Sequence, residues 1–180
     1  NIYRFYPSKI DIAEAMTRRF SAENNAAYAN IIRDSAKSPS RKLSEFFNAR
    51  LERTFRIFEK NPKLMELAEI MGRERPDFLA EERAQERILI EKILEDGAKS
   101  GDFALTENLA ITADLVQCAM MKFRIPHLWT TEQLVSLRIE LEGVLHHEIN
   151  RLFFGHVWED PRRFTDPDAW ATATEITANE

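Results

Sequence analysis

The sequence predicts an all-α fold. Apolar residues recur at helical spacing along most of the chain, and strand-type alternation of apolar and polar residues is missing from it. Gly and Pro are few, with five and seven among 180 residues, and a chain of this length can bury one hydrophobic core. No run approaches the roughly 20 apolar residues of a membrane span. We therefore expect no membrane partner.

The first long helix is predicted to begin directly after Ser8. Ser8 is followed by Asp11 three places on, a pattern that can satisfy free backbone N–H groups at a helix start. Pro7 separates this helix from any earlier one. No strong breaker follows until the segment KSPS at residues 37–40, so we expect one long connecting helix that ends near residue 36.

Three further helices are predicted between residues 40 and 101. Ser40 is expected to cap the first of them, whose apolar face is unusually rich in aromatic residues. The segment KNP at residues 60–62 begins a short helix that Gly72 is expected to end. The next helix starts in the charged segment RERPDFLAEERAQER and is expected to stop near Gly97 and Gly101.

The last two predicted helices carry more apolar surface than one neighbour would cover. One runs from Thr106 to Phe123, and the other runs from Thr130 or Thr131 to Gly155. Exposed apolar patches of that size are rarely left to water, so we expect a homodimer in which a two-fold pairing covers these helices. The residues predicted for this interface are Val116, Leu134, Leu137, Leu141, Val144, Leu145 and Ile149.

Catalytic and metal-binding motifs are weak or missing in the sequence. It contains no Gly-rich phosphate loop, Gly-x-Ser-x-Gly elbow or Cys-His constellation, so neither an enzyme nor a cofactor is expected. Glu142 and His146 are four residues apart and could share a metal, but HExxH and the pair of Glu-x-x-His motifs of a di-iron bundle are both missing. A metalloenzyme is therefore not favoured. The single cysteine, Cys118, indicates a reduced, cytoplasmic setting.

The opening segment NIYRFYPSK carries the most specific signal. The chain has no initiator Met, so either a segment precedes Asn1 or a leader has been removed, and we expect the former. The aromatic run, the turn and the Ser8-Lys9 helix start closely resemble the end of the helix-turn-helix in TetR-family transcriptional regulators. The order of the later helices follows that family in outline, and MKFRIPHLW is similar to sequences of its AcrR-like members. The resemblance implies about 45 residues before Asn1.

This resemblance implies a division into three parts and a function. Residues 1–8 would end a DNA-binding domain, residues 9–155 would form a helical effector-binding and dimerisation domain, and residues 156–180 would form a polar tail. The tail is expected either to hold a short helix around Trp170 or to be partly disordered. The implied protein is a ligand-responsive regulator, usually a repressor, that binds a double-stranded DNA operator. The alternative is a dimerisation or small-molecule-binding module without DNA binding.

The same resemblance implies site residues for DNA and for an effector. Tyr3 and Lys9 would contact phosphates, and Asn1 would contact the DNA backbone or a base edge. Independently of the resemblance, the charge of Lys9 and the free backbone N–H groups at the same helix start suit an anion such as phosphate. For Lys9 the alternative is an ordinary solvated lysine. A hydrophobic or aromatic effector would lie in a pocket between the middle helices, although general burial statistics favour plain core for each lining residue taken separately. Those residues are Phe47, Phe55, Phe58, Met65, Met71, Met120, Phe123 and Trp129.

Overall fold

The computed structural model describes residues 8–105, 108–129 and 131–154, with side chains described as far as His147. Within these ranges the chain forms helices and no strand, which confirms the all-α prediction. The elements are α1 (Lys9–Arg33), α2 (Pro39–Lys60), α3 (Leu64–Glu74), α4 (Pro76–Ser100), α5 (Leu109–Ala119), α6 (Met121–Arg124), the short 3₁₀ helix η2 (Pro126–Leu128) and α7 (Leu134–Phe154).

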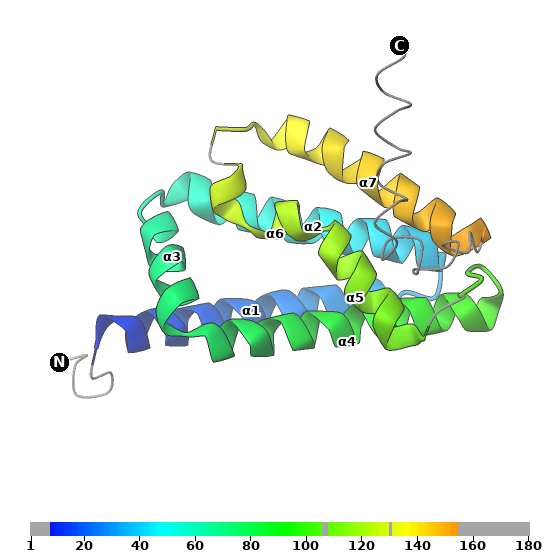
Figure 1. Ribbon diagram of the computed structural model, residues 1–180, viewed down its shortest axis with the longest axis horizontal. Coiled ribbons are helices and arrows are strands. Elements are labelled where there is room, and N and C mark those ends of the chain that lie inside the picture. The colour runs from blue at the N-terminus through cyan, green and yellow to red at the C-terminus, as the bar shows by residue number, and fades with distance from the viewer. Residues whose placement is uncertain (1–7, 106–107, 130, 155–180) are drawn as a thin grey trace, which may run out of the picture.

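Three long helices form the centre of the fold, and the others pack around them (Figure 1). Helices α1, α2 and α4 contact one another, α5 packs on α4, and α7 packs on α2. The short helix α3 runs across one end of the molecule and contacts both α1 and α4. The corner between α3 and α4 therefore lies beside the beginning of α1, at the end where the chain enters the fold (Figure 1).

The main hydrophobic core lies between α1, α2, α4, α5 and α7. Phe46 is fully buried at its centre, and its ring meets the rings of Tyr28 and Phe47 edge to face, each at a centroid distance of 5.0 Å. Such aromatic pairs add about 0.5–1.5 kcal/mol beyond the area they bury. The aromatic face predicted for the second helix is therefore used mainly to build the core.

The first predicted helix start is confirmed in detail, and the second is displaced by two residues. The Ser8 hydroxyl accepts a hydrogen bond from the backbone N–H of Asp11 at 3.2 Å, and the Asp11 carboxylate accepts one from the Ser8 backbone. For α2 the cap is Ser38, not Ser40. Pro39 explains the difference, because Pro is favoured at the first helical position, where no N–H donor is needed.

Two glycines predicted to stop helices lie inside them. Helix α3 continues through Gly72 to Glu74, and it ends where Pro76 restricts the backbone of Arg75. Helix α4 likewise continues through Gly97 and stops only at Gly101, whose φ of +79° is in the left-handed region that favours glycine. One helix predicted to reach residue 123 is interrupted after Ala119, and α6 follows as a single separate turn.

Candidate ligand cavity and its link to the first helix

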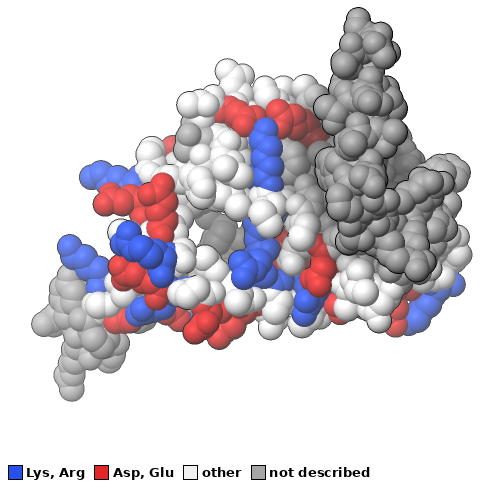
Figure 2. Space-filling model, in the orientation of Figure 1, with Lys and Arg blue, Asp and Glu red and all other residues white. Residues whose placement is uncertain are grey.

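A cavity of about 840 Å³ lies between α3, α4, α5 and α6. The surface is visibly hollowed there, with basic and acidic side chains at its border (Figure 2). The volume is in the range of cavities that hold small-molecule ligands, roughly 300–1,000 Å³. The lining residues are Met65, Ala68, Glu69, Gly72, Leu79, Arg83, Asp114, Gln117, Cys118, Met121, Arg124, Ile125, Pro126 and His127.

The lining is chiefly apolar and includes two methionines. Met65 lies on α3 and Met121 on α6, and Leu79 and Ile125 complete the apolar wall. Methionine is unbranched and polarizable, so it adapts to ligands of different shapes. Met121 is 48% exposed, which is high for a large apolar side chain and leaves its surface available to a ligand. The arrangement is suited to binding an apolar molecule.

Two arginines contribute positive charge to the cavity lining. Arg83 comes from α4, and its guanidinium forms no hydrogen bond or ion pair with another described residue. Arg124 comes from α6, and its Nη1 lies 3.1 Å from Oε2 of Glu86. Asp114, also in the lining, is paired with Arg87 at 3.1 Å. The cavity therefore combines apolar walls with guanidinium groups.

A second, small cavity of about 90 Å³ lies behind Arg124 and is polar. The buried carboxylate of Glu86 forms ion pairs with two arginines there, Arg50 at 3.3 Å and Arg124 at 3.1 Å. Burial lowers the pKa of Arg124 to about 10, so its guanidinium stays protonated at neutral pH. Burial also raises the pKa of Tyr28 to about 12. Arg124 thus separates an apolar cavity from a buried polar cluster.

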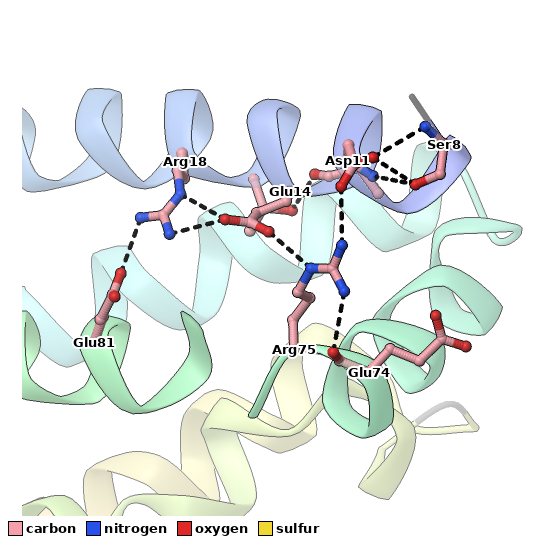
Figure 3. Close-up of polar contacts among 9 residues, drawn as sticks. Ser8, Asp11, Glu14, Arg18, Glu74, Arg75 and Glu81 are labelled. Atoms are coloured by element: carbon pink, nitrogen blue, oxygen red, sulfur yellow. Dashed lines mark hydrogen bonds and ion pairs between the residues drawn. The ribbon is translucent and has the colours of Figure 1, made fainter. Parts of the chain in front are cut away.

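A polar junction joins the corner between α3 and α4 to the first turns of α1 (Figure 3). Arg75 donates from Nη2 to Oδ1 of Asp11 at 2.9 Å and from Nε to Oε2 of Glu14 at 3.0 Å. Arg18 also binds Glu14, at 2.8 Å, and reaches Glu81 on α4 at 3.0 Å. One guanidinium at the corner therefore holds two carboxylates of α1.

The electrostatics of this junction favour the charged forms of its groups. The hydrogen bond from the Ser8 side chain, with help from Arg75, lowers the pKa of Asp11. The hydrogen bond from Arg18, followed by that from Arg75, lowers the pKa of Glu14. Below the ion pairs, Phe78 packs with Ala13 and Met71, and Arg18 lies 4.7 Å above the Phe78 ring. Polar and apolar contacts thus fix the same corner.

Of the eight residues predicted for the pocket, only Met65 lines the large cavity. Phe55 and Phe58 are half-buried against the main core, and the Phe55 ring stacks on Trp129 at 5.6 Å. The remaining five are buried: Phe47, Met120, Phe123 and Trp129 lie in the main core, and Met71 lies in the small cluster under α1. Aromatic character alone did not separate cavity from core, because both are apolar.

The residues predicted for DNA contact lie at the edge of the described structure. Lys9 is exposed at the first position of α1 and forms no ion pair with another described residue. Asn1 and Tyr3 lie outside the described residues, as does the tail 156–180.

Glu142 accepts hydrogen bonds from Asn48 and Ser44 on α2, and no group of three or more potential metal ligands occurs among the described residues. None of the described helices is long and apolar enough to span a membrane.

The residues predicted for a subunit interface are mostly used within the chain. Val116, Leu137, Leu141 and Leu145 are at most 1% exposed, because α5 packs on α4 and α7 packs on α2. Leu134 and Val144 are half-buried against the same core, and the side chain of Ile149 lies outside the described residues. Among the described side chains of these two helices, the large apolar ones left exposed are Ile111, Leu115, Val135 and Ile139.

A family model described as the tetracyclin repressor-like C-terminal domain matches residues 39–145. The chain belongs to the tetracyclin repressor-like family. This match confirms the TetR resemblance and spans every residue that lines the large cavity. Membership in this family means that the domain is of a regulatory, ligand-binding type and all-α. Comparisons with curated proteins and with solved structures each found no match.

Three charged residues of this tetracyclin repressor-like domain were missed by the sequence analysis. Arg75, Arg83 and Arg124 lie in charged or mixed segments, which usually indicate solvated helix faces. One local signal was available: Arg75 directly precedes Pro76, so it had to lie at a break between helices. The other two could not be recognised without knowing that α4 and α6 face the same cavity.

Proposed function

We propose that this chain is the effector-binding and dimerisation part of a DNA-binding transcriptional regulator. It acts as a repressor that a hydrophobic or aromatic small molecule releases from its operator. One observation carries the proposal: the apolar cavity is lined by α3 and α4, and the corner between those two helices is bound by Arg75 to the start of α1. Membership in the tetracyclin repressor-like family supports a regulatory role.

The geometry supports a simple route from ligand to DNA. A ligand between α3 and α6 favours one position of α3, and Arg75 transfers that position to Asp11 and Glu14 on α1. In a dimer the two DNA readers must fit half-sites about 34–36 Å apart, so a shift of a few ångströms at the start of α1 spoils the fit. The ligand acts only if it binds the two arrangements with different affinity.

The proposal is tested with the intact protein, its natural N-terminus included, and the neutral apolar dye Nile red. We expect specific, saturable anisotropy changes with DNA from its own upstream region, at two subunits per site. Saturating Nile red should weaken that binding by at least about fivefold. Ala68→Trp, which fills the cavity from α3, should abolish dye binding, whereas Ala98→Trp, exposed on α4 outside the lining, should not.

The route through Arg75 has its own matched pair of variants. Arg75→Gln should retain dye and DNA binding but reduce the effect of the dye on DNA affinity to less than about twofold. Arg73→Gln, which changes the same charge on the solvent side of α3, should behave as wild type. Equal coupling in both variants would remove Arg75 from the route. Equal binding to scrambled DNA would favour a dimerisation or ligand-binding module without DNA binding.

A further inference from the structure

The chemical class of the cavity's ligand can be inferred from the charges in its lining. Apolar residues from α3, α4 and α6 provide most of the wall, and Arg83 and Arg124 are its two arginines. A guanidinium that faces an apolar cavity loses hydration, and it regains hydrogen bonds if a ligand brings an oxygen anion. The balance of the surrounding charges decides whether such an anion is favoured.

The charged groups that line the small cavity behind Arg124 balance one another. They are Arg50 and Arg124 with Glu82 and Glu86. Arg83 lines the large cavity, forms no ion pair with another described residue and therefore adds one positive charge there. Both ion pairs use the same oxygen of Glu86, so this carboxylate is shared between Arg50 and Arg124 rather than committed to one.

The donors of both arginines are not all used inside the protein. Arg83 has no hydrogen bond or ion pair from its guanidinium to another described residue. In Arg124 the Nη1 atom is buried, lies near Glu86 and still lacks a hydrogen bond of suitable geometry. Nη1 is enclosed beside Glu86, so a ligand in the cavity would meet other atoms of the Arg124 side chain, which keeps 17% of its surface exposed and forms no hydrogen bond with another described residue. Both arginines can therefore accept a ligand without losing an existing hydrogen bond.

Negative charge elsewhere in the lining does not cancel this preference. Asp114 is 52% exposed and paired at 3.1 Å with Arg87, which also lies 3.6 Å from Glu91, so solvent and Arg87 together weaken the effect of this carboxylate. Glu69 is exposed on α3 and has no partner among the described residues, so solvent screens it more than it screens the half-buried Arg124. One net charge suits a monovalent carboxylate better than a doubly charged phosphate.

We propose that the cavity binds a monocarboxylic acid with an apolar chain or ring. Arg83 and Arg124 hold its carboxylate, and Met65, Leu79, Met121 and Ile125 contact its apolar part. This inference rests on the proposed function of the cavity as the effector site, and it adds a class of effector to it.

The test compares three head groups on one tail in the intact protein. Decanoate, decan-1-ol and decylammonium, each below its aggregation concentration, displace Nile red from the cavity. Decanoate should bind about tenfold more tightly than decanol, because one charge-assisted hydrogen-bonded pair contributes about that much to affinity. Decylammonium should bind most weakly. Arg83→Gln should remove the preference for decanoate, and Arg73→Gln, with the same change of charge outside the cavity, should retain it.

Each outcome separates this inference from the proposed function. Dye displacement with equal affinities for decanoate and decanol, or tighter binding of decylammonium, overturns the carboxylate inference and leaves the cavity as a site for apolar ligands. A preference for decanoate that survives Arg83→Gln overturns the assigned role of Arg83. If Nile red does not bind the wild type, the proposed effector site and this inference both fail. The wild-type comparison of head groups needs no variant to fold.

Discussion

At the residue scale, Gly97 is the described glycine with the least room for a side chain. A Cβ at this position would lie 2.1 Å from Cδ2 of Phe103, and Phe103 is buried and donates its backbone N–H to the Gly97 carbonyl at 3.0 Å. The ring therefore has little room to move. Glycine is required here for close approach, since the residue lies within helix α4, which ends only at Gly101.

We expect Gly97→Ala to lower the free energy of unfolding by about 1–3 kcal/mol, the usual cost of overpacking a core. Gly143→Ala is the matched control, because a Cβ there meets no atom within 4 Å and Gly143 is an exposed residue inside α7. Gly143→Ala should raise the free energy of unfolding by up to about 1 kcal/mol. Urea denaturation followed by circular dichroism measures both. Similar effects of the two changes would contradict the packing argument.

At the element scale, the sequence allowed the helices to be predicted better than their ends. The reciprocal cap of Ser8 and Asp11 is a local motif, and it was identified correctly. Gly72 and Gly97 were misread as stops because a glycine inside a helix and one after it look alike in sequence. Only tertiary packing distinguishes them: at Gly97 the neighbouring Phe103 excludes any side chain. Prolines 39 and 76 were the more reliable boundary signals.

The junction between α1 and the corner of α3 and α4 should make stability depend on pH. Folded Asp11 and Glu14 have pKa values below their ordinary 3.8 and 4.5, so near those values the unfolded chain binds more protons. Their contribution is present above these ordinary values and is lost as the pH falls through the lowered ones. We expect the free energy of unfolding to decrease from about pH 5 to pH 3.

Arg75→Gln should make this decrease shallower, because Arg75 contributes to both shifts. Other carboxylates, such as Glu45, titrate in the same range, so the comparison is made with Arg73→Gln, whose partner Glu74 lies outside the junction. Urea denaturation at half-unit pH intervals gives the two curves. An Arg75 variant that follows the Arg73 variant throughout would show that the junction does not stabilise the folded chain.

At the scale of the whole molecule, we expect a partner subunit to pack on the exposed face of α7. Val135 and Ile139 are 66% and 70% exposed and lie one turn apart, while Leu141 and Leu145 are buried. Helical periodicity shows how many apolar residues a helix carries but not which neighbouring helices cover them. Most of the residues predicted for the interface are covered by α2 and α4 within the chain, and the exposed apolar side chains lie at other positions of the same two helices.

We expect the double variant Val135→Glu and Ile139→Glu to be monomeric with unchanged helicity, because a dimer would bury two charges at the contact. The matched control changes Ile88 and Met16 to Glu, which are 55% and 61% exposed on α4 and α1. Sedimentation equilibrium gives the oligomeric state of both. Dimers in the first variant, or monomers in the second, would place the contact elsewhere.

The candidate site was only partly predictable, and the reason lies in how the cavity is assembled. Met65 was identified because it is a methionine among apolar residues, but the cavity also needs α4, α5 and α6 to face α3. Those contacts join segments up to about 60 residues apart, which helical periodicity does not encode. Arg83 and Arg124 acquire a role only through that assembly. The class of fold follows from local patterns, and the chemistry of the cavity follows from tertiary structure.

The position of Cys118 gives the chain its own reporter. It is the single cysteine in the sequence, it is exposed, and it lies in the wall of the large cavity. A maleimide dye sensitive to polarity would therefore attach beside the space that a ligand enters. Its emission would change as a ligand displaces water from the cavity. The measurement needs no substitution in the chain.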